Sequence, residues 1–269
     1  MTAYGREQFA ETVAMDYARR QYARQYAAFS QADAVYGALE HKALGHPQTE
    51  GLEVGERRTL PMTVAFLDLT NFTRRTFWDE LDDVVDLAHA VLTGFIETVD
   101  RFGGHPLGLR GDGLFAGFGG ERSFASAMAL SACALALDAV QNGVNPWLDA
   151  KGMEHIQARA GLDSGNISFV RTGNDNHSEV NALGFAANFA AKCEKVADSW
   201  EIVVGEGVHD ALPAYPYFTP HAGSPKVYER LGERKYYRFY NVSWRRALPH
   251  LGQVPEELAG TSTSQIRSS

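Results

Sequence analysis

The chain has 269 residues, of which 45% are hydrophobic and 22% charged, and its net charge is −8 at neutral pH. This is the composition of a folded globular protein, and the acidic balance argues against nucleic acid as the main partner, because phosphate backbones bind basic surfaces. No signal peptide is visible, and no apolar run approaches the length of about 20 residues that a membrane span needs. With only two cysteines, Cys133 and Cys193, we expect a reduced, cytoplasmic protein with no membrane partner.

The N-terminal part of the chain predicts a helix and a linker. Apolar residues, many of them aromatic, recur at steps of three or four over residues 6–42, as on one face of a helix. Residues 45–58 are rich in glycine, proline and charge, which is typical of a linker. We therefore divide the chain into an N-terminal helical extension and linker (1–58), which we expect to support a dimer, a main domain (59–245) and a tail (246–269) whose composition predicts disorder.

Strands and helices alternate through the main domain. The strand predictions are 63–69, 104–109, 114–118, two strands within 156–170 joined by a turn at Asp163-Ser164-Gly165, 201–204 and 235–244; the helix predictions are 81–100, 123–141 and 182–198. Residues 171–180 form a polar excursion. The order strand–helix–strand–strand–helix–strand predicts an α+β fold of the ferredoxin-like βαββαβ type, with the helices on one face of the sheet.

Two aspartates occupy positions that suggest a metal site. Asp68 ends the strand 63–69, and Asp112 lies between two glycines in the turn of the predicted hairpin. Either residue alone is explained as a capping or turn residue. Together they converge if the hairpin lies beside the first strand, and two carboxylates repel one another unless a cation such as Mg²⁺ or Mn²⁺ lies between them. The segment LTNFT (69–73) would direct backbone N–H groups to the same place, where they could hold phosphate.

Other catalytic patterns are weaker or absent. The segment GDGLFA (111–116) formally satisfies a dinucleotide-binding fingerprint, but it continues as a strand where that motif needs a helix. The sequence has no zinc-binding His or Cys spacing, no nucleophile-elbow serine and no phosphate-binding loop with its lysine. On the predicted helix 182–198, Asn188 and Lys192 are four residues apart and share a face, which by itself suits an exposed polar pair.

Four segments, in this order and at these separations, resemble the class III nucleotidyl cyclase domain: FLDLTNFT (66–73), RGDGLFAGFG (110–119), ARAGLDSGNIS (158–168) and LGFAANFAAKCE (183–194). The resemblance covers roughly residues 60–243. It implies a homodimer with two shared active sites, each binding a nucleoside triphosphate and two divalent cations, Mn²⁺ or Mg²⁺. It further implies that Asp68, Asp112 and the Leu69 carbonyl bind metal, and that the backbone of Phe72 and Thr73 holds the triphosphate.

The same resemblance implies roles for further residues, of which Asn188 and Lys192 come from the other subunit. Asn188 matches the asparagine that orients the ribose. Lys192 stands where the family carries an arginine that stabilises the transition state, and lysine keeps the charge of that arginine but not its planar fork. Among the basic residues of the C-terminal hairpin, we expect Arg230 to contact phosphate, with Arg234 and Lys235 as alternatives.

The base pocket departs from the familiar pattern. Adenylate cyclases usually have a lysine at the position of Gly108 and an aspartate or threonine at that of Asn181, and the guanine-reading pair is absent too. Arg110 and Phe185 are unusual residues nearby, and we interpret this set as a pocket for a smaller base with carbonyl acceptors. The chain looks like the stand-alone cyclases of bacterial Pycsar antiphage systems, which supply cyclic UMP or cyclic CMP to a downstream effector.

This interpretation predicts conversion of UTP, or CTP, to its 3′,5′-cyclic monophosphate and pyrophosphate. Two alternatives stay open: an adenylate cyclase with an unorthodox base pocket, and a cyclase-like module that binds nucleotide without turnover.

Overall fold

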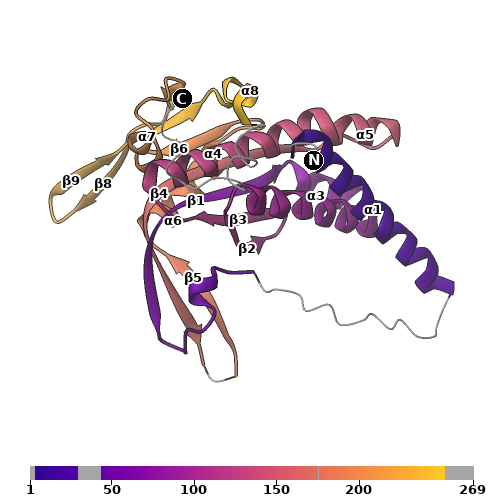
Figure 1. The fold of residues 1–269 in the computed structure, drawn as a ribbon, viewed down its shortest axis with the longest axis horizontal. Helices are drawn as coiled ribbons and strands as arrows, with labels where there is room; N and C mark the ends of the chain where they lie inside the picture. The colour runs from indigo at the N-terminus through magenta and orange to yellow at the C-terminus, as the bar shows by residue number, and fades with distance from the viewer. Residues whose placement is uncertain (1–3, 30–43, 175, 252–269) are drawn as a thin grey trace.

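The computed structural model describes residues 4–29, 44–174 and 176–251. An eight-stranded sheet forms its centre, in the order β2-β3-β1-β4-β6-β10-β7, with β5 paired to β4 (Figure 1). The strands of this sheet are β1 (Arg57–Thr70), β2 (His105–Arg110), β3 (Gly113–Phe118), β4 (Gln157–Gly173), β5 (Ser178–Leu183), β6 (Ile202–Gly205), β7 (Phe218–Pro220) and β10 (Phe239–Val242). A separate hairpin consists of β8 (Lys226–Arg230) and β9 (Glu233–Tyr237), and it projects from the body of the molecule in Figure 1.

The helices are α1 (Arg6–Phe29), α2 (Phe72–Trp78), α3 (Leu81–Arg101), α4 (Arg122–Ala139), α5 (Asn145–Ala150), α6 (Phe185–Val196), α7 (Glu206–Ala211) and α8 (Leu248–Leu251). Short 3-10 turns lie at Pro47–Thr49 and Trp244–Arg246, and a π turn at Val140–Val144 joins α4 to α5. The predicted α+β fold is confirmed, and the predicted helices at 81–100, 123–141 and 182–198 correspond to α3, α4 and α6.

The two faces of the sheet carry different helices. Along β1 the side chains alternate: Ala65 and Leu67 join the main core with α1, α3 and α4, whereas Val64 and Phe66 join a smaller core with α6. The expectation that the helices share one face is therefore wrong. The reason is that β4 carries apolar residues on both faces, and the small residues of α6, such as Ala190, let that helix pack closely against the second one.

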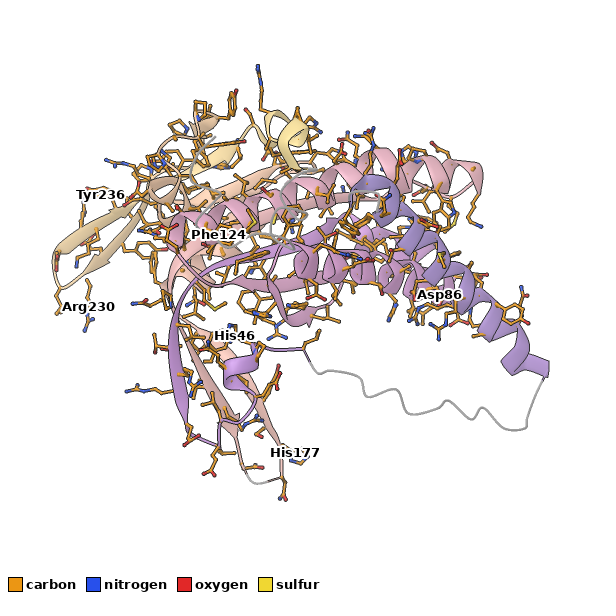
Figure 2. All side chains as sticks on the ribbon, in the orientation of Figure 1. His46, Asp86, Phe124, His177, Arg230 and Tyr236 are labelled. Carbon is orange, nitrogen blue, oxygen red and sulfur yellow. The ribbon has the colours of Figure 1, made fainter. Side chains whose placement is uncertain are left out.

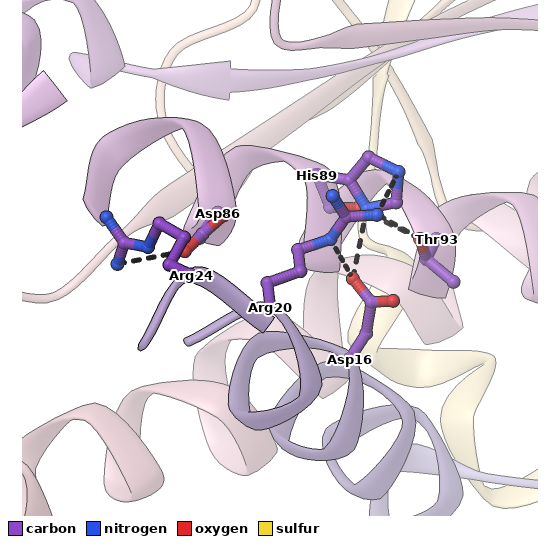
Figure 3. Close-up of polar contacts among 6 residues, drawn as sticks. All are labelled: Asp16, Arg20, Arg24, Asp86, His89 and Thr93. Atoms are coloured by element: carbon purple, nitrogen blue, oxygen red, sulfur yellow. Dashed lines mark hydrogen bonds and ion pairs between the residues drawn. The ribbon is translucent and has the colours of Figure 1, made fainter. Parts of the chain in front are cut away.

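Helix α1 packs into the main core. Phe9 and Val13 are fully buried and Tyr17 nearly so, which confirms the predicted helix as far as Phe29; residues 30–43 lie outside the described residues. The polar side of α1 meets α3 through ion pairs, among them Arg24 with Asp86 at 3.0 Å (Figure 3). The predicted supporting role in a dimer stays a prediction.

Both ends of the main domain differ slightly from expectation. β1 begins at Arg57, inside the predicted linker. At the other end, α8 lies in the predicted tail and Leu251 is buried in the main core, so the tail begins with folded structure. Residues 252–269 lie outside the described residues.

Strand β4 corrects the sequence interpretation most clearly. The predicted turn at Asp163-Ser164-Gly165 does not exist, because β4 runs unbroken and pairs with β1 from Val170 to Gln157. The hairpin turn lies further on, between β4 and β5. Asp163 is tolerated within a buried strand because its carboxylate accepts hydrogen bonds from the backbone N–H groups of Ser164 and Gly207.

The predicted strand 235–244 is also two strands. Tyr237 ends β9, which pairs with β8, and Phe239 begins β10, which pairs with β6. The chain changes sheets at Arg238, whose backbone N–H donates to Glu206 Oε2 at 3.0 Å.

Cys133 and Cys193 are buried and free. The expectation that no apolar run approaches the length of a membrane span is wrong for one helix. The continuous helical segment Arg122–Ala150 is long and apolar enough to span a membrane by length and composition, but 83% of its most apolar window is buried inside the domain, as in the core helix of a soluble protein.

Gly161 fixes the approach of α6 to the sheet. A Cβ at this position would overlap the backbone of Ala190 and Glu194, so only glycine lets α6 lie this close to β4. We expect Gly161→Ala to lower the free energy of unfolding by about 1–3 kcal/mol through overpacking, measured by urea denaturation. Gly119→Ala is the matched control, because a Cβ there meets no atom within 4 Å. Equal stability of the two variants would contradict this account.

Candidate active site

The two aspartates meet at the end of β1. β1 pairs with β3 in antiparallel register, Leu67 opposite Leu114, so the turn that carries Asp112 lies level with Asp68. Both aspartates line one hollow of about 390 Å³. The other predicted metal and triphosphate residues line the same hollow, namely Leu69, Phe72 and Thr73. The structure therefore brings together the five residues that the sequence assigned to metal and triphosphate.

An arginine that the sequence analysis did not single out lies in this hollow. Arg159 on β4 donates to Asp68 Oδ2 from Nη2 at 2.9 Å, and it also pairs with Glu194 on α6 at 2.5 Å. The other oxygen of Asp68, Oδ1, lies against Gly113, beside Asp112. A lone arginine between two alanines in a buried strand was the signal that could have revealed it, because such a charge needs a partner.

The hollow favours a positive charge. Burial raises the pKa of Asp112, and the nearby Asp68 carboxylate raises it further, against the opposing effects of the Asp112 backbone N–H and Arg159. Burial also raises the pKa of Glu194, against the attraction of Arg159. Three carboxyl groups thus share one guanidinium, and an added cation would stabilise their ionised forms.

The residues of the hollow fit a divalent cation of the magnesium type. Carboxylate and carbonyl oxygens are the donors that Mg²⁺ and Mn²⁺ take, and magnesium sites often use one or two carboxylates and complete their shell with water and substrate phosphate. Among the described residues, no group of three or more His, Cys, Asp or Glu side chains forms a complete metal site. A metal bound by Asp68 and Asp112 would need further ligands, such as water or substrate phosphate, to complete its shell.

A second, larger hollow of about 900 Å³ lies on the α6 face of the sheet. Its lining includes four predicted substrate residues: Gly108, Arg110, Asn181 and Asn188. A Cβ on Gly108 would lie 3.6 Å from Arg110 Nη1, so the guanidinium lies over the space that a side chain at position 108 would enter. The structure brings the base and ribose candidates together here.

The two hollows are separate. Their linings, as far as the described residues define them, have no residue in common. Asp68 and Asp112 face one hollow, and Asn188 faces the other. Within one chain, the predicted metal residues and the predicted ribose residue therefore line different hollows.

Lys192 and Phe185 lie beside the β8–β9 hairpin. Lys192 is exposed on α6; its Nζ donates to Tyr228 Oη at 3.0 Å and lies 5.0 Å from the centre of that ring. Phe185 stacks on Phe189 and meets Tyr237 edge-on at 4.7 Å. Neither is part of the two hollows, so their predicted roles in catalysis and substrate binding stay predictions.

The basic residues of the hairpin are also apart from both hollows. Arg230 lies at the tip of the β8–β9 hairpin (Figure 2). Of the two alternatives, Arg234 pairs with Glu229 at 2.9 Å and Lys235 with Glu233 at 3.5 Å. None of the three lines the hollow of Asp68 and Asp112, so the predicted phosphate contact stays a prediction.

Asp163 ties the hairpin to the sheet. It is fully buried, and Tyr237 of β9 donates a hydrogen bond to its Oδ2 at 3.0 Å. Burial raises the pKa of Asp163 to about 7, against the hydrogen bonds that favour its charged form. Sequence reasoning missed this contact because Tyr237 lies 74 residues further along the chain.

The fold is that of class III nucleotidyl cyclase domains. The chain superposes on the adenylyl cyclase CyaB from P. aeruginosa with a TM-score of 0.59 and 19% identity, covering 70% of this chain and 95% of that one. It superposes on the guanylyl cyclase Cya2 with a TM-score of 0.58 and 18% identity, covering 71% and 94%.

In sequence, the chain is related to cytidylate cyclases. It is 28% identical to one from Escherichia coli over 221 residues, which cover 79% of this chain and 48% of that protein. It is 26% identical to one from Staphylococcus aureus over 183 residues, covering 65% and 43%. The chain spans less than half the length of these relatives, and no family model matches it.

Ionisation of Asp163 is expected to weaken the fold. Its pKa rises from 3.8 to about 7 on folding, so the folded protein binds an extra proton between these values, and this contribution to stability is lost as pH rises through about 7. The shift corresponds to at most about 4 kcal/mol. Asp163→Asn removes the titrating group, so only the wild type should lose this stability. We therefore expect the unfolding free energy of the variant, minus that of the wild type, to rise from pH 4 to pH 8. A constant difference, measured by denaturation at each pH, would contradict the shifted pKa.

Proposed function

We propose that the chain is a metal-dependent nucleotidyl cyclase that converts a pyrimidine nucleoside triphosphate to its 3′,5′-cyclic monophosphate and pyrophosphate. The observation that carries this proposal is the pairing of Asp68 with Asp112 in a hollow that Phe72 and Thr73 also line. The class III cyclase fold supports the reaction type, and the relatives named cytidylate cyclase support a pyrimidine base. The sequence expectation of UTP stays a prediction.

The reaction needs no protein nucleophile. The ribose 3′-hydroxyl gives up its proton to water, its oxygen attacks the α-phosphorus, the bond to the bridging oxygen of the β-phosphate breaks, and pyrophosphate leaves with that oxygen. Two divalent cations held by Asp68, Asp112 and the Leu69 carbonyl would supply neutralising charge and lower the pKa of the 3′-hydroxyl.

The remaining roles belong to side and main chains of the protein. The backbone at Phe72 and Thr73 would hold the phosphates, and Asn188 would fix the ribose so that its 3′-oxygen faces the α-phosphorus. Lys192 would stabilise the charge that develops on the α-phosphate. Its contact with Tyr228 keeps the ammonium group at the surface of α6, where a partner's substrate could meet it.

We infer that the active enzyme is a symmetric homodimer. The metal residues and Asn188 face separate hollows, so two chains related by a two-fold axis would form two complete sites. Large apolar side chains are exposed at the larger hollow and beside it, as at an interface: Leu109, Leu183 and Phe185. By resemblance we also propose that the enzyme is cytoplasmic and makes a second messenger for an effector of antiphage defence.

A turnover assay with four nucleotides tests the proposal. With Mn²⁺ present, we expect the wild-type chain to convert CTP or UTP to a cyclic product and pyrophosphate, and Asp112→Asn to reduce the rate by about 10²–10³-fold. The variant should keep its circular dichroism spectrum and melting temperature, since Asp112 lies in a turn. Turnover of ATP alone would favour the atypical adenylate cyclase, and no turnover of any triphosphate would favour the silent nucleotide-binding module.

A mixing experiment tests the shared site. Asp112→Asn and Asn188→Ala should each be inactive, but an equimolar mixture should regain about one quarter of wild-type activity, because half of the dimers are mixed and each mixed dimer has one intact site. The mixture is to be refolded or co-expressed so that subunits exchange. Mixing Asp112→Asn with Asp68→Asn is the control. Both changes remove a metal residue, so every site of the mixed dimer carries one of them and the mixture should regain no activity. Equal recovery in both mixtures, or none in either, would contradict the shared site.

A further inference from the structure

Arg110 and Glu179 lie side by side at the larger hollow. Arg110 is the last residue of β2 and Glu179 the second residue of β5, and these strands are not neighbours in the sheet. Arg110 Nη2 nevertheless lies 4.0 Å from Glu179 Oε1, and both side chains line the hollow that contains Asn181 and Asn188. The fold thus places a cation and an anion together where the base would bind.

The stability of the fold does not account for this pair. The two side chains are 61% and 70% exposed, and exposed ion pairs at such distances contribute little because solvent screens them. The guanidinium also lies over Gly108, which offers no side chain to compete with it. Arg110 Nη1 donates one hydrogen bond to the Leu109 carbonyl at 2.9 Å, and the other N–H groups of the guanidinium and the Glu179 carboxylate are available to a ligand in the hollow.

We propose that Arg110 and Glu179 together read the Watson–Crick edge of cytosine. This rests on the proposed function, and it narrows the base from a pyrimidine to cytosine. A guanidinium only donates hydrogen bonds, through parallel N–H groups, and a carboxylate only accepts them. Cytosine presents two acceptors in a row, O2 and N3, followed by the N4 amino donor. Arg110 donates to the two acceptors, and Glu179 accepts from the amino group.

Uracil has the opposite pattern at two of these three positions. Its N3–H is a donor that faces the guanidinium, and its O4 is an acceptor that faces the carboxylate, so both contacts are repulsive. Adenine matches the pair in part, because its N6 amino group and N1 have the same order as N4 and N3 but lack a counterpart of O2. A site built to pair with polar groups rejects a ligand that leaves those groups unpaired. The expected order of preference is CTP, then ATP, then UTP.

Glu179→Gln tests the role of the carboxylate. A carboxamide can donate to O4 as well as accept from N4, so the variant should tolerate uracil. We expect the ratio of kcat/KM for CTP to that for UTP to fall by at least about tenfold. Arg110→Lys should lower the ratio for CTP over ATP, because a single ammonium group does not span two adjacent acceptors.

Glu154→Gln is the matched control. Glu154 also lies 4.0 Å from an arginine, Arg74, and is 68% exposed, but it lines neither hollow. The ratio of kcat/KM for CTP to that for UTP should be the same in Glu154→Gln as in the wild type. A wild type that prefers UTP, or a Glu179→Gln variant with an unchanged ratio, would overturn the proposal.

The proposal can fail independently of the proposed function. If the wild type converts no triphosphate, cyclase activity is wrong. Calorimetric titration with CTP and with UTP then still tests the base reading: tighter binding of CTP that is lost in Glu179→Gln supports it, and equal binding of the two nucleotides overturns it.

Discussion

One guanidinium connects the end of β1 with helix α6. Arg159 pairs with Asp68, at the end of β1, and with Glu194, on the helix that also carries Asn188 and Lys192. Through these two ion pairs Arg159 holds α6 beside the hollow that Asp68 and Asp112 line. The carboxyl groups around Arg159 outnumber its single positive charge, so the hollow still favours an added cation. Gly161, two residues after Arg159 on β4, is where the backbone of α6 comes closest to the sheet. The position of the ribose candidate and the electrostatics of the metal candidates are therefore physically linked.

This arrangement explains why one chain looks incomplete. The candidate metal residues and the candidate base residues line different hollows, so in the proposed enzyme each chain contributes one part of two sites. A two-fold axis that places one half against the other would convert both into complete sites and cover the exposed apolar residues at once. In the proposed enzyme, dimer formation and site assembly are the same event.

Much of the fold, and the convergence of the two candidate metal residues, could be predicted from the sequence. The apolar run that ends at Asp68 and the Asp-Gly turn before β3 are local signals, and together they predicted that Asp68 and Asp112 lie close to each other. The turn wrongly predicted at Asp163 shows the limit of such signals. Its Asp-Ser-Gly composition is typical of a turn, but hydrogen bonds from Gly207 and Tyr237 satisfy the carboxylate inside a strand.

The sequence by itself determined the fold class, the metal candidates and the absence of the usual base-reading lysine at Gly108, because these depend on residue identity and short-range spacing. Only the tertiary structure decided that α6 covers the second face of the sheet, that the two hollows are separate, and that Arg110 lies over Gly108 beside Glu179. These facts depend on contacts between strands far apart in the chain. Such contacts are selected by the packing and polar pairing of the whole domain, and no local pattern encodes them.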